Sequence, residues 1–293
     1  TDGPNGYALG STPSLHQPSA SSTLVRPRMI EPQLPVALTI AGSDSGGGAG
    51  IQADLKTFHQ FGVFGTCAVT AITAQNTVGV QSIHSVPVSE VRAQIDAVVT
   101  DLPPRAFKTG MLGSLELVHS VAAAIDDHDL RAYVMDPVMV ATSGDRLLPE
   151  ETESAIAEVL LSRVALVTPN LQEAAVLSGG PVTSLAEMAA AARLLVDRGA
   201  GAALIKGGHL DGDAVDLFWD GETERIWRRS RIDTVHTHGT GCTLSAAITA
   251  GLATGNTLEG AVDRAIRFVS RAIQTAPGLG KGHGPVNHFA PTD

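Results

Sequence analysis

Two glycines, Gly239 and Gly241, lead directly into an Ala-rich stretch that is typical of a helix. Backbone N–H groups at the start of a helix point outward and attract anions, and the helix dipole adds to the attraction. Small residues let a ligand approach the backbone closely. The turn from Gly239 through Thr240 to Gly241 therefore predicts an anion-binding site. The alternative is a glycine-rich helix start that binds nothing.

Cys242 follows this turn and lies in the predicted first turn of the helix. The same dipole favours a thiolate there, so the sequence predicts a base or a nucleophile. The alternative role is a small buried side chain, which is the common fate of an isolated cysteine. Cys67 lies within an apolar, strand-like segment and fits that second role.

Phosphoryl transfer needs a phosphate cradle, a neutralising cation and a group that takes the hydroxyl proton. Lys206 follows a predicted strand and is a candidate for neutralising phosphate. Glu173 is a candidate ligand for Mg²⁺, directly or through water, because this ion uses few carboxylates. Asn170 precedes Glu173 by three residues, which also fits a helix N-cap with its capping-box partner. The two roles are compatible.

The elements that must position these groups alternate between strand and helix along the chain. This alternation favours a mostly parallel, doubly wound α/β sheet, in which ligands bind beyond the carboxyl ends of the strands. Glycine or proline beside polar side chains follows five predicted strands. These segments are residues 42–50, 108–111, 136–139, 168–173 and 206–209. The sequence therefore predicts one active-site edge.

Hydrophobic periodicity and turn residues give the approximate bounds of the elements. Strands are predicted at 36–40, 66–73, 132–135, 165–168 and 202–205, and a hairpin at 216–219 and 225–231. Helices are predicted at 51–58, 89–99, 114–126, 150–161, 184–198 and 241–276. Residues 1–35 are rich in Ser, Pro, Gly and Thr and predict a disordered tail. The rest, residues 36–290, is expected to form a single domain.

Composition excludes several classes of protein. The net charge of −10 argues against nucleic acid as a partner, because nucleic-acid-binding proteins usually carry a basic face. Two cysteines cannot build a disulfide framework, which indicates a reducing compartment. No apolar run reaches the length that a membrane span requires. The histidines, His238 among them, match no zinc-site spacing and receive no predicted role.

A dinucleotide-binding fingerprint is only partly present. Gly48, Gly50 and Ala53 have the right spacing, but an acidic residue is also required about 20 positions further on. The next strand ends instead near Gln75 and Asn76. We therefore reject NAD as a cofactor, and the chain has no Walker A motif either.

Taken together and in order, the motifs resemble those of the hydroxymethylpyrimidine/phosphomethylpyrimidine kinases of thiamin biosynthesis, members of the ribokinase-like superfamily. The resemblance covers roughly residues 36–290. It rests on segments 37–44, 48–56, 74–77, 108–112, 136–139, 168–170, 206–209 and 238–245. It implies a three-layer α/β/α sandwich with a mostly parallel central sheet, a cytoplasmic homodimer, and the use of ATP and Mg²⁺.

The resemblance also implies a substrate site made of Gly42, Asp54, Gln75, Met111 and Val138. Asp54 and Gln75 are expected to hydrogen-bond the nitrogens and the amino group of a pyrimidine. Met111 and Val138 are expected to pack against the faces of its ring.

On the phosphate side, the resemblance implies an anion hole from Gly239 to Cys242, with Cys242 as the base and Lys206 as a catalytic cation. Related sugar kinases have Asp where Cys242 stands, so the cysteine indicates the pyrimidine branch. The expected nucleotide-binding residues are Asn170, Lys206, Gly208 and Thr240, and the expected magnesium ligands are Asp136 and Glu173.

The expected reaction is ATP-dependent phosphorylation of 4-amino-5-hydroxymethyl-2-methylpyrimidine, followed by phosphorylation of the monophosphate to the diphosphate. A pyridoxal kinase is the nearest alternative, because pyridoxal is also a flat ring with a hydroxymethyl group. A non-catalytic pyrimidine sensor is the second. Lys206, Glu173 and the anion-hole turn argue against the sensor, since a pure binder needs none of them.

Overall fold

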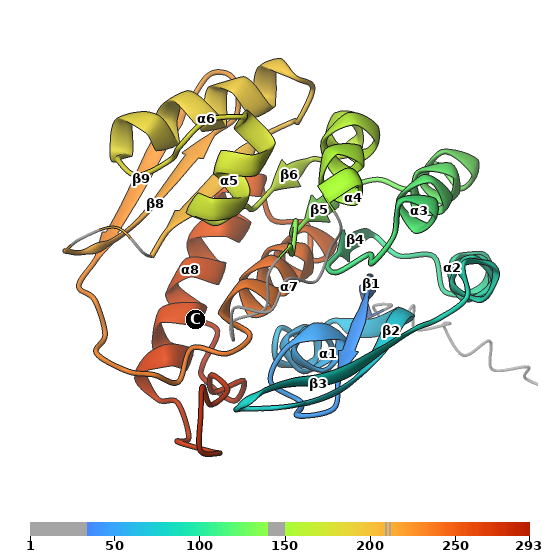
Figure 1. Cartoon of the computed structure of the whole chain (residues 1–293), viewed down its shortest axis with the longest axis horizontal. Coiled ribbons are helices and arrows are strands. Elements are labelled where there is room, and N and C mark those ends of the chain that lie inside the picture. The colour runs from blue at the N-terminus through green and yellow to red at the C-terminus, as the bar shows by residue number, and fades with distance from the viewer. Residues whose placement is uncertain (1–33, 140–149, 209, 211) are drawn as a thin grey trace, which may run out of the picture. The chain divides into compact units, whose positions relative to one another are not determined.

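A computed structural model describes residues 34–139, 150–208, 210 and 212–293. The residues from Leu34 to Asp293 form one compact unit, in which a nine-stranded sheet lies between two layers of helices (Figure 1). The predicted tail, residues 1–35, falls outside the described residues except for its last two. Within the described part of the chain, no helix is both long enough and apolar enough to cross a membrane.

The sheet has the strand order β3-β2-β1-β4-β5-β6-β7-β8-β9. Its strands are β1 (Val36–Asp44), β2 (Phe64–Asn76), β3 (Gly79–Ser85), β4 (Ala106–Thr109), β5 (Tyr133–Met135), β6 (Leu166–Val167), β7 (Ala203–Gly207), β8 (Ala214–Trp219) and β9 (Glu224–Arg229). Neighbouring strands pair in parallel along the part of the sheet with the order β2-β1-β4-β5-β6-β7. The β3–β2, β7–β8 and β8–β9 pairs are antiparallel. The prediction of a mostly parallel sheet is confirmed.

Helices cover both faces of the sheet (Figure 1). One layer contains α2 (Val88–Asp101), α3 (Leu115–Asp127), α4 (Glu150–Ala155), α5 (Leu171–Ser178) and α6 (Leu185–Asp197). The other contains α1 (Gly50–Gln60), α7 (Thr240–Ala253) and α8 (Leu258–Gln274). Each layer packs on the sheet through its own apolar core, which explains why central strands such as β4 are buried on both faces. The three-layer sandwich is confirmed.

The prediction of one long helix over residues 241–276 is wrong. Helix α7 ends near Gly255, whose φ of 87° lies in the left-handed region that favours glycine. The hydroxyl of Thr257 then accepts the N–H of Gly260 and starts α8. The two helices pack closely, because a Cβ on Gly251 would lie 2.8 Å from the Cβ of Ala261.

Three further segments can be compared with the sequence prediction. The hairpin β8–β9 is confirmed, and the Asp220 carboxylate accepts the N–H groups of Glu222 and Thr223 in its turn. Strand β3 was not predicted, because most of its residues are exposed and it has no apolar alternation. The predicted helix at 150–161 continues beyond α4 as a π-helical turn, Ile156–Leu160.

The order in which successive strands are added to the sheet changes direction at β1. Strand β2 lies on one side of β1 and β4 on the other, so the carboxyl ends of β1 and β4 form a topological switch point. Ligands of open α/β sheets bind at such points. The glycine-rich turn 42–50 and the segment after Lys108 both start here, and helix α7 begins beside them.

Candidate active site

The start of α7 is built on a glycine that no other residue can replace. Gly239 is its N-cap, with a φ of 80°. A Cβ at this position would lie 1.8 Å from the carbonyl oxygen of Gly48. The predicted anion-hole turn therefore packs directly against the glycine-rich turn that follows β1.

Lys206, at the end of β7, lies over the same turn. A Cβ on Gly241 would be only 3.2 Å from its Nζ. Helix geometry leaves the first N–H groups of α7 without intrahelical partners, so donors and a positive charge face one space. The structure thus brings together Lys206, Gly239, Gly241 and Cys242, which the sequence placed in one site.

Two carboxylates hold the Lys206 ammonium group. Its Nζ donates to Asp136 Oδ1 at 3.0 Å and lies 3.9 Å from Glu173 Oε2. Burial by itself would lower the pKa of Lys206, but the Asp136 and Glu173 charges outweigh it and raise that pKa above its ordinary value. Lys206 is therefore a permanent cation, and 16% of its side chain remains exposed.

The predicted magnesium ligands, Asp136 and Glu173, lie on either side of this lysine. Asp136 is buried after β5, and its Oδ2 accepts a hydrogen bond from Ser245 at 3.3 Å. Burial raises the pKa of Glu173 to about 7, although the Lys206 charge opposes the rise. Glu173 also accepts the N–H of Asn170, and Asn170 Oδ1 accepts the N–H of Glu173. The predicted capping box is confirmed.

The remaining predicted nucleotide-binding residues lie near the ends of neighbouring strands and at the start of α7. Asn170 bridges to Lys206 where β6 and β7 end. Gly208 follows β7, and its carbonyl accepts a hydrogen bond from Arg231. Thr240 is the first residue of α7, and its hydroxyl donates to the Thr237 carbonyl at 2.7 Å.

Cys242 is half-buried in the first turn of α7, between two helix starts. Burial raises the pKa of its thiol to about 12, although the Lys108 charge and the N–H of Gly50, the first residue of α1, favour the thiolate. Burial therefore opposes the thiolate that the start of the helix was expected to favour.

Asp54 does not face the site, so its predicted role in reading the ring is corrected. Its side chain is fully buried on the inner face of α1. Oδ1 accepts a hydrogen bond from Lys108 Nζ at 2.8 Å, and Oδ2 accepts one from the Thr39 hydroxyl at 2.6 Å. Because its side chain has no exposed surface, Asp54 is out of reach of a ligand in this structure. Its spacing with Ile51 and Phe58 was the sequence signal for this inner position.

Three predicted substrate contacts lie along the ends of β1, β4 and β5. A Cβ on Gly42 would lie 2.8 Å from Met111 Cε, so a larger residue there would require the flexible end of the methionine to move. The Met111 carbonyl accepts a hydrogen bond from the Thr70 hydroxyl at 2.7 Å. Val138 follows Asp136, is half-buried, and packs against the same apolar core as Met111. An apolar wall borders this side of the site.

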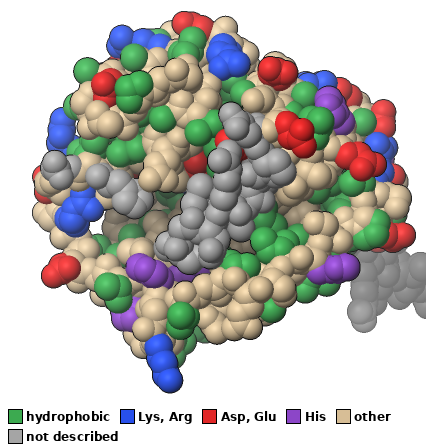
Figure 2. All heavy atoms as spheres, in the orientation of Figure 1, with side chains coloured by type: hydrophobic (Ala, Val, Ile, Leu, Met, Phe, Trp, Pro, Cys, Tyr) green, Lys and Arg blue, Asp and Glu red, His purple; other side chains and the backbone are tan. Residues whose placement is uncertain are grey.

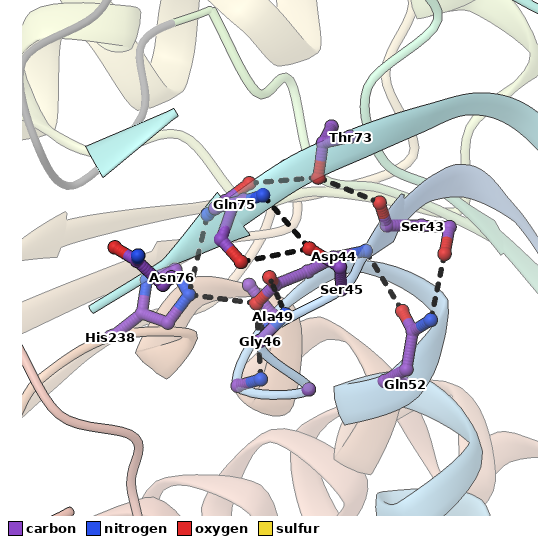
Figure 3. Close-up of polar contacts among 12 residues, drawn as sticks. Ser43, Asp44, Ser45, Gly46, Ala49, Gln52, Thr73, Gln75, Asn76 and His238 are labelled. Carbon is purple, nitrogen blue, oxygen red and sulfur yellow. Dashed lines mark hydrogen bonds and ion pairs between the residues drawn. The ribbon is translucent and has the colours of Figure 1, made fainter. Parts of the chain in front are cut away.

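Sequence reasoning missed the centre of the glycine-rich turn, which is the Asp44 carboxylate (Figure 3). Oδ1 accepts the N–H of Gly46 at 2.8 Å, and Oδ2 accepts those of Gly48 and Ala49 at 3.0 and 2.8 Å. His238 Nε2 lies 2.9 Å from the same Oδ2. Burial alone would raise the pKa of Asp44, but these hydrogen bonds hold it below its ordinary value.

Gln75 completes this side of the site at the end of β2. Its backbone N–H and carbonyl both bond the Ser45 hydroxyl, and its side-chain amide lies between Thr73 and His238 (Figure 3). The amide is partly exposed and near the anion-hole turn, since His238 directly precedes Gly239. In the sequence, the position of His238 four residues before Cys242 could have indicated that it lies near the site.

Comparison with known proteins adds to this geometry. The family model of phosphomethylpyrimidine kinase matches residues 44–287. The hydroxymethylpyrimidine/phosphomethylpyrimidine kinase of Bacillus subtilis is 48% identical and that of Rhizobium meliloti 52%. Both alignments cover 87% of this chain, and they cover 94% and 97% of the relatives.

Solved structures of similar chains include pyridoxal kinases and a phosphomethylpyrimidine kinase. An ADP complex of Bacillus subtilis pyridoxal kinase has a TM-score of 0.82 and 39% identity, covering 88% of this chain and 98% of that one. The phosphomethylpyrimidine kinase of Clostridium difficile has a TM-score of 0.74 and 38% identity, covering 81% and 99%.

Proposed function

The chain belongs to the phosphomethylpyrimidine kinase family, and we propose that it uses ATP to phosphorylate 4-amino-5-hydroxymethyl-2-methylpyrimidine and then the resulting monophosphate. The observation that carries the proposal is the position of Lys206 over the first turn of α7, where its Nζ would lie 3.2 Å from a Cβ on Gly241. A cation and outward N–H groups around one space stabilise a phosphoryl group in transfer.

Cys242 is the proposed acceptor of the hydroxymethyl proton. It lies in the same helical turn as Gly241, and the Gly50 N–H and the Lys108 charge both favour its thiolate. Only the thiolate can accept a proton, so the enzyme works through its deprotonated fraction. The transition state of phosphoryl transfer is loose and leaves the attacking oxygen little changed, which reduces the base strength that the reaction demands.

Asp136 and Glu173 are the proposed magnesium ligands. Their carboxylate oxygens are donors that Mg²⁺ prefers, and burial raises the pKa of Glu173 to about 7, so a bound cation would favour its carboxylate form. Among residues 34–139, 150–208, 210 and 212–293, no three His, Cys, Asp or Glu side chains gather into a metal cage. This suits an ion held largely by water and phosphate. When bound, Mg²⁺ neutralises phosphate charge.

A coupled assay with ATP and Mg²⁺ tests the function on three compounds: the pyrimidine, its monophosphate and pyridoxal. We expect turnover of both pyrimidines with a higher kcat/KM than that of pyridoxal. Preferential turnover of pyridoxal would favour the second candidate, which the likeness to Bacillus subtilis pyridoxal kinase supports. Binding of the pyrimidine without ATP turnover would indicate a sensor.

A homodimer is part of the proposal. Strand β3 is an edge of the sheet, and the β2–β3 hairpin exposes Ile72, Val78 and Ile83 by 54%, 69% and 44%. Exposed apolar side chains on an edge hairpin favour contact with a second copy of the chain. Light scattering should give twice the monomer mass, and Ile83→Lys should lower it. A monomeric wild-type protein would contradict the dimer.

We also propose the cytoplasm as the compartment. Cys67 and Cys242 are both free, and the reaction uses ATP. A thiol that must ionise fits a reducing compartment. Nucleic acid is not a proposed partner, because the net charge is −10 and Lys and Arg side chains are scattered over the face in Figure 2. Fractionation of cells that express the chain would test its location.

A further inference from the structure

His238 connects the glycine-rich turn to the side chain that is expected to read the ring. Its Nε2 lies 2.9 Å from Asp44 Oδ2 and 3.4 Å from the amide nitrogen of Gln75 (Figure 3). The imidazole is buried, and it packs so closely on Gly48 that a Cβ there would lie 2.6 Å from His238 Cδ2. The ring therefore has little freedom to turn.

Asp44 determines the hydrogen on Nε2. A carboxylate only accepts hydrogen bonds, and this one already accepts backbone N–H groups from the glycine-rich turn. An unprotonated Nε2 at 2.9 Å would place a lone pair against a carboxylate oxygen. Nε2 therefore carries a hydrogen and donates it to Asp44, whichever form the rest of the ring takes.

This hydrogen determines which end of the Gln75 amide faces His238. An amide N–H would face a protonated Nε2 that has no lone pair to accept it, whereas the carbonyl oxygen would face the positive edge of the N–H group that Asp44 accepts. A half-turn about the terminal bond of Gln75 exchanges its oxygen and nitrogen without moving other atoms, so the count of donors and acceptors decides between the two orientations. His238 favours the orientation with the carbonyl oxygen toward it.

Thr73 favours the same orientation from the other end. Its hydroxyl lies 2.9 Å from the Ser43 carbonyl and 3.2 Å from the Gln75 amide. The carbonyl of Ser43 can only accept, so the single hydroxyl hydrogen of Thr73 is used there. Thr73 is then an acceptor toward Gln75 and matches its NH₂ end. Both neighbours orient the amide in one direction, and one N–H and one carbonyl lone pair remain for a ligand.

We propose that His238, held by Asp44, is a specificity-determining positioning residue that locks the Gln75 amide so that the site accepts a 4-aminopyrimidine and rejects its 4-oxo analogue. The 4-amino ring presents an acceptor nitrogen beside a donor NH₂, and the 4-oxo ring presents the reverse. An amide that is free to turn can pair with the edge of either ring. A locked amide pairs with the 4-amino ring, but against the 4-oxo ring it places a donor against a donor. This inference rests on the proposed function.

The test compares kcat/KM for the 4-amino pyrimidine and its 4-oxo analogue in the wild type and in His238→Phe. Phenylalanine keeps a ring against Gly48 and removes the Nε2 hydrogen. We expect the ratio of the two kcat/KM values to fall by about tenfold or more, because the 4-oxo analogue gains a partner. Thr73→Val should lower the ratio as well, whereas Thr73→Ser keeps the hydroxyl and should preserve it.

An unchanged ratio in His238→Phe, with both substrates equally weakened, would overturn the inference and leave the function intact. A wild type that phosphorylates neither pyrimidine would overturn the function itself. If His238→Phe does not fold, long-range ¹H–¹⁵N spectra of the wild type still decide. We expect a proton on Nε2 of His238, and a ring protonated on Nδ1 alone would contradict the lock.

Discussion

Two lysine–aspartate pairs lie at the carboxyl ends of parallel strands, and they differ in access to solvent. Lys206 of β7 pairs with Asp136 at 3.0 Å, and Lys108 of β4 pairs with Asp54 at 2.8 Å. The side chains of the first pair are 16% and 2% exposed, and those of the second are fully buried. We therefore propose that the same kind of ion pair serves a ligand in one place and the fold in the other.

The buried pair connects β1, α1 and β4, since Thr39 of β1 also donates to Asp54. Removing two charges from water costs several kcal/mol, and close pairing offsets that cost. The open pair has a further carboxylate, Glu173, 3.9 Å from its lysine, and faces the start of α7. The two pairs consist of the same residue types, so residue type alone does not distinguish their proposed roles. Exposure and the neighbouring helix start do.

The buried pair should give the largest effect on stability. Lys108→Met leaves the Asp54 carboxylate buried without its counter-ion, so we expect the free energy of unfolding to fall by about 3–5 kcal/mol. Lys206→Met should cost less, because the Lys206 side chain is 16% exposed and water can reach the position that it leaves beside Asp136. Urea unfolding measures both values. Equal losses would show that the two pairs do not differ in this way.

The open pair should give the largest effect on turnover. Lys206→Met removes the charge that is proposed to stabilise the phosphoryl group, so we expect kcat to fall about 10²–10³-fold. The KM for the pyrimidine should change little. Steady-state kinetics at saturating ATP provide the measurement. An unchanged kcat with weaker pyrimidine binding would place Lys206 in a different role.

Cys242 should contribute less than Lys206. Cys242→Ser keeps the size of the side chain but gives a much weaker base, and we expect kcat to fall by about 10². Cys242→Asp should restore part of the activity, because a carboxylate can accept the same proton. Thiol alkylation should inactivate the wild type, and bound pyrimidine should slow it. Near wild-type turnover by Cys242→Ser would exclude the base role.

The pH dependence of kcat provides a second test of Cys242 as the base. Its pKa is raised to about 12, and only the thiolate accepts a proton, so kcat should rise from neutral pH toward that value. The slope should be about tenfold per pH unit while chemistry limits the rate. Cys242→Asp should flatten the profile, since its carboxylate is already ionised. A flat profile for the wild type would contradict this account.

Local patterns predicted the parts of the site that depend on nearby residues. The Asn170–Glu173 capping box and the glycine turn before Cys242 are short motifs whose geometry follows from spacing. Contacts between residues far apart in the sequence could not be predicted from local patterns. Lys108 pairs with Asp54 across 54 positions, and His238 meets Asp44 across 194. The sequence therefore misassigned Asp54 and gave His238 no role.

The most direct test of the central claim compares two neutral double variants, Lys108→Met/Asp54→Leu and Lys206→Met/Asp136→Leu. Each removes a lysine together with its aspartate, so neither aspartate is left without its lysine. Phosphoryl transfer from ATP to the pyrimidine is measured at equal concentrations of folded protein. We predict that the first variant stays within about tenfold of the wild type and that the second loses about 10³-fold or more. Equal losses in the two variants, or a greater loss in the first, would contradict the account.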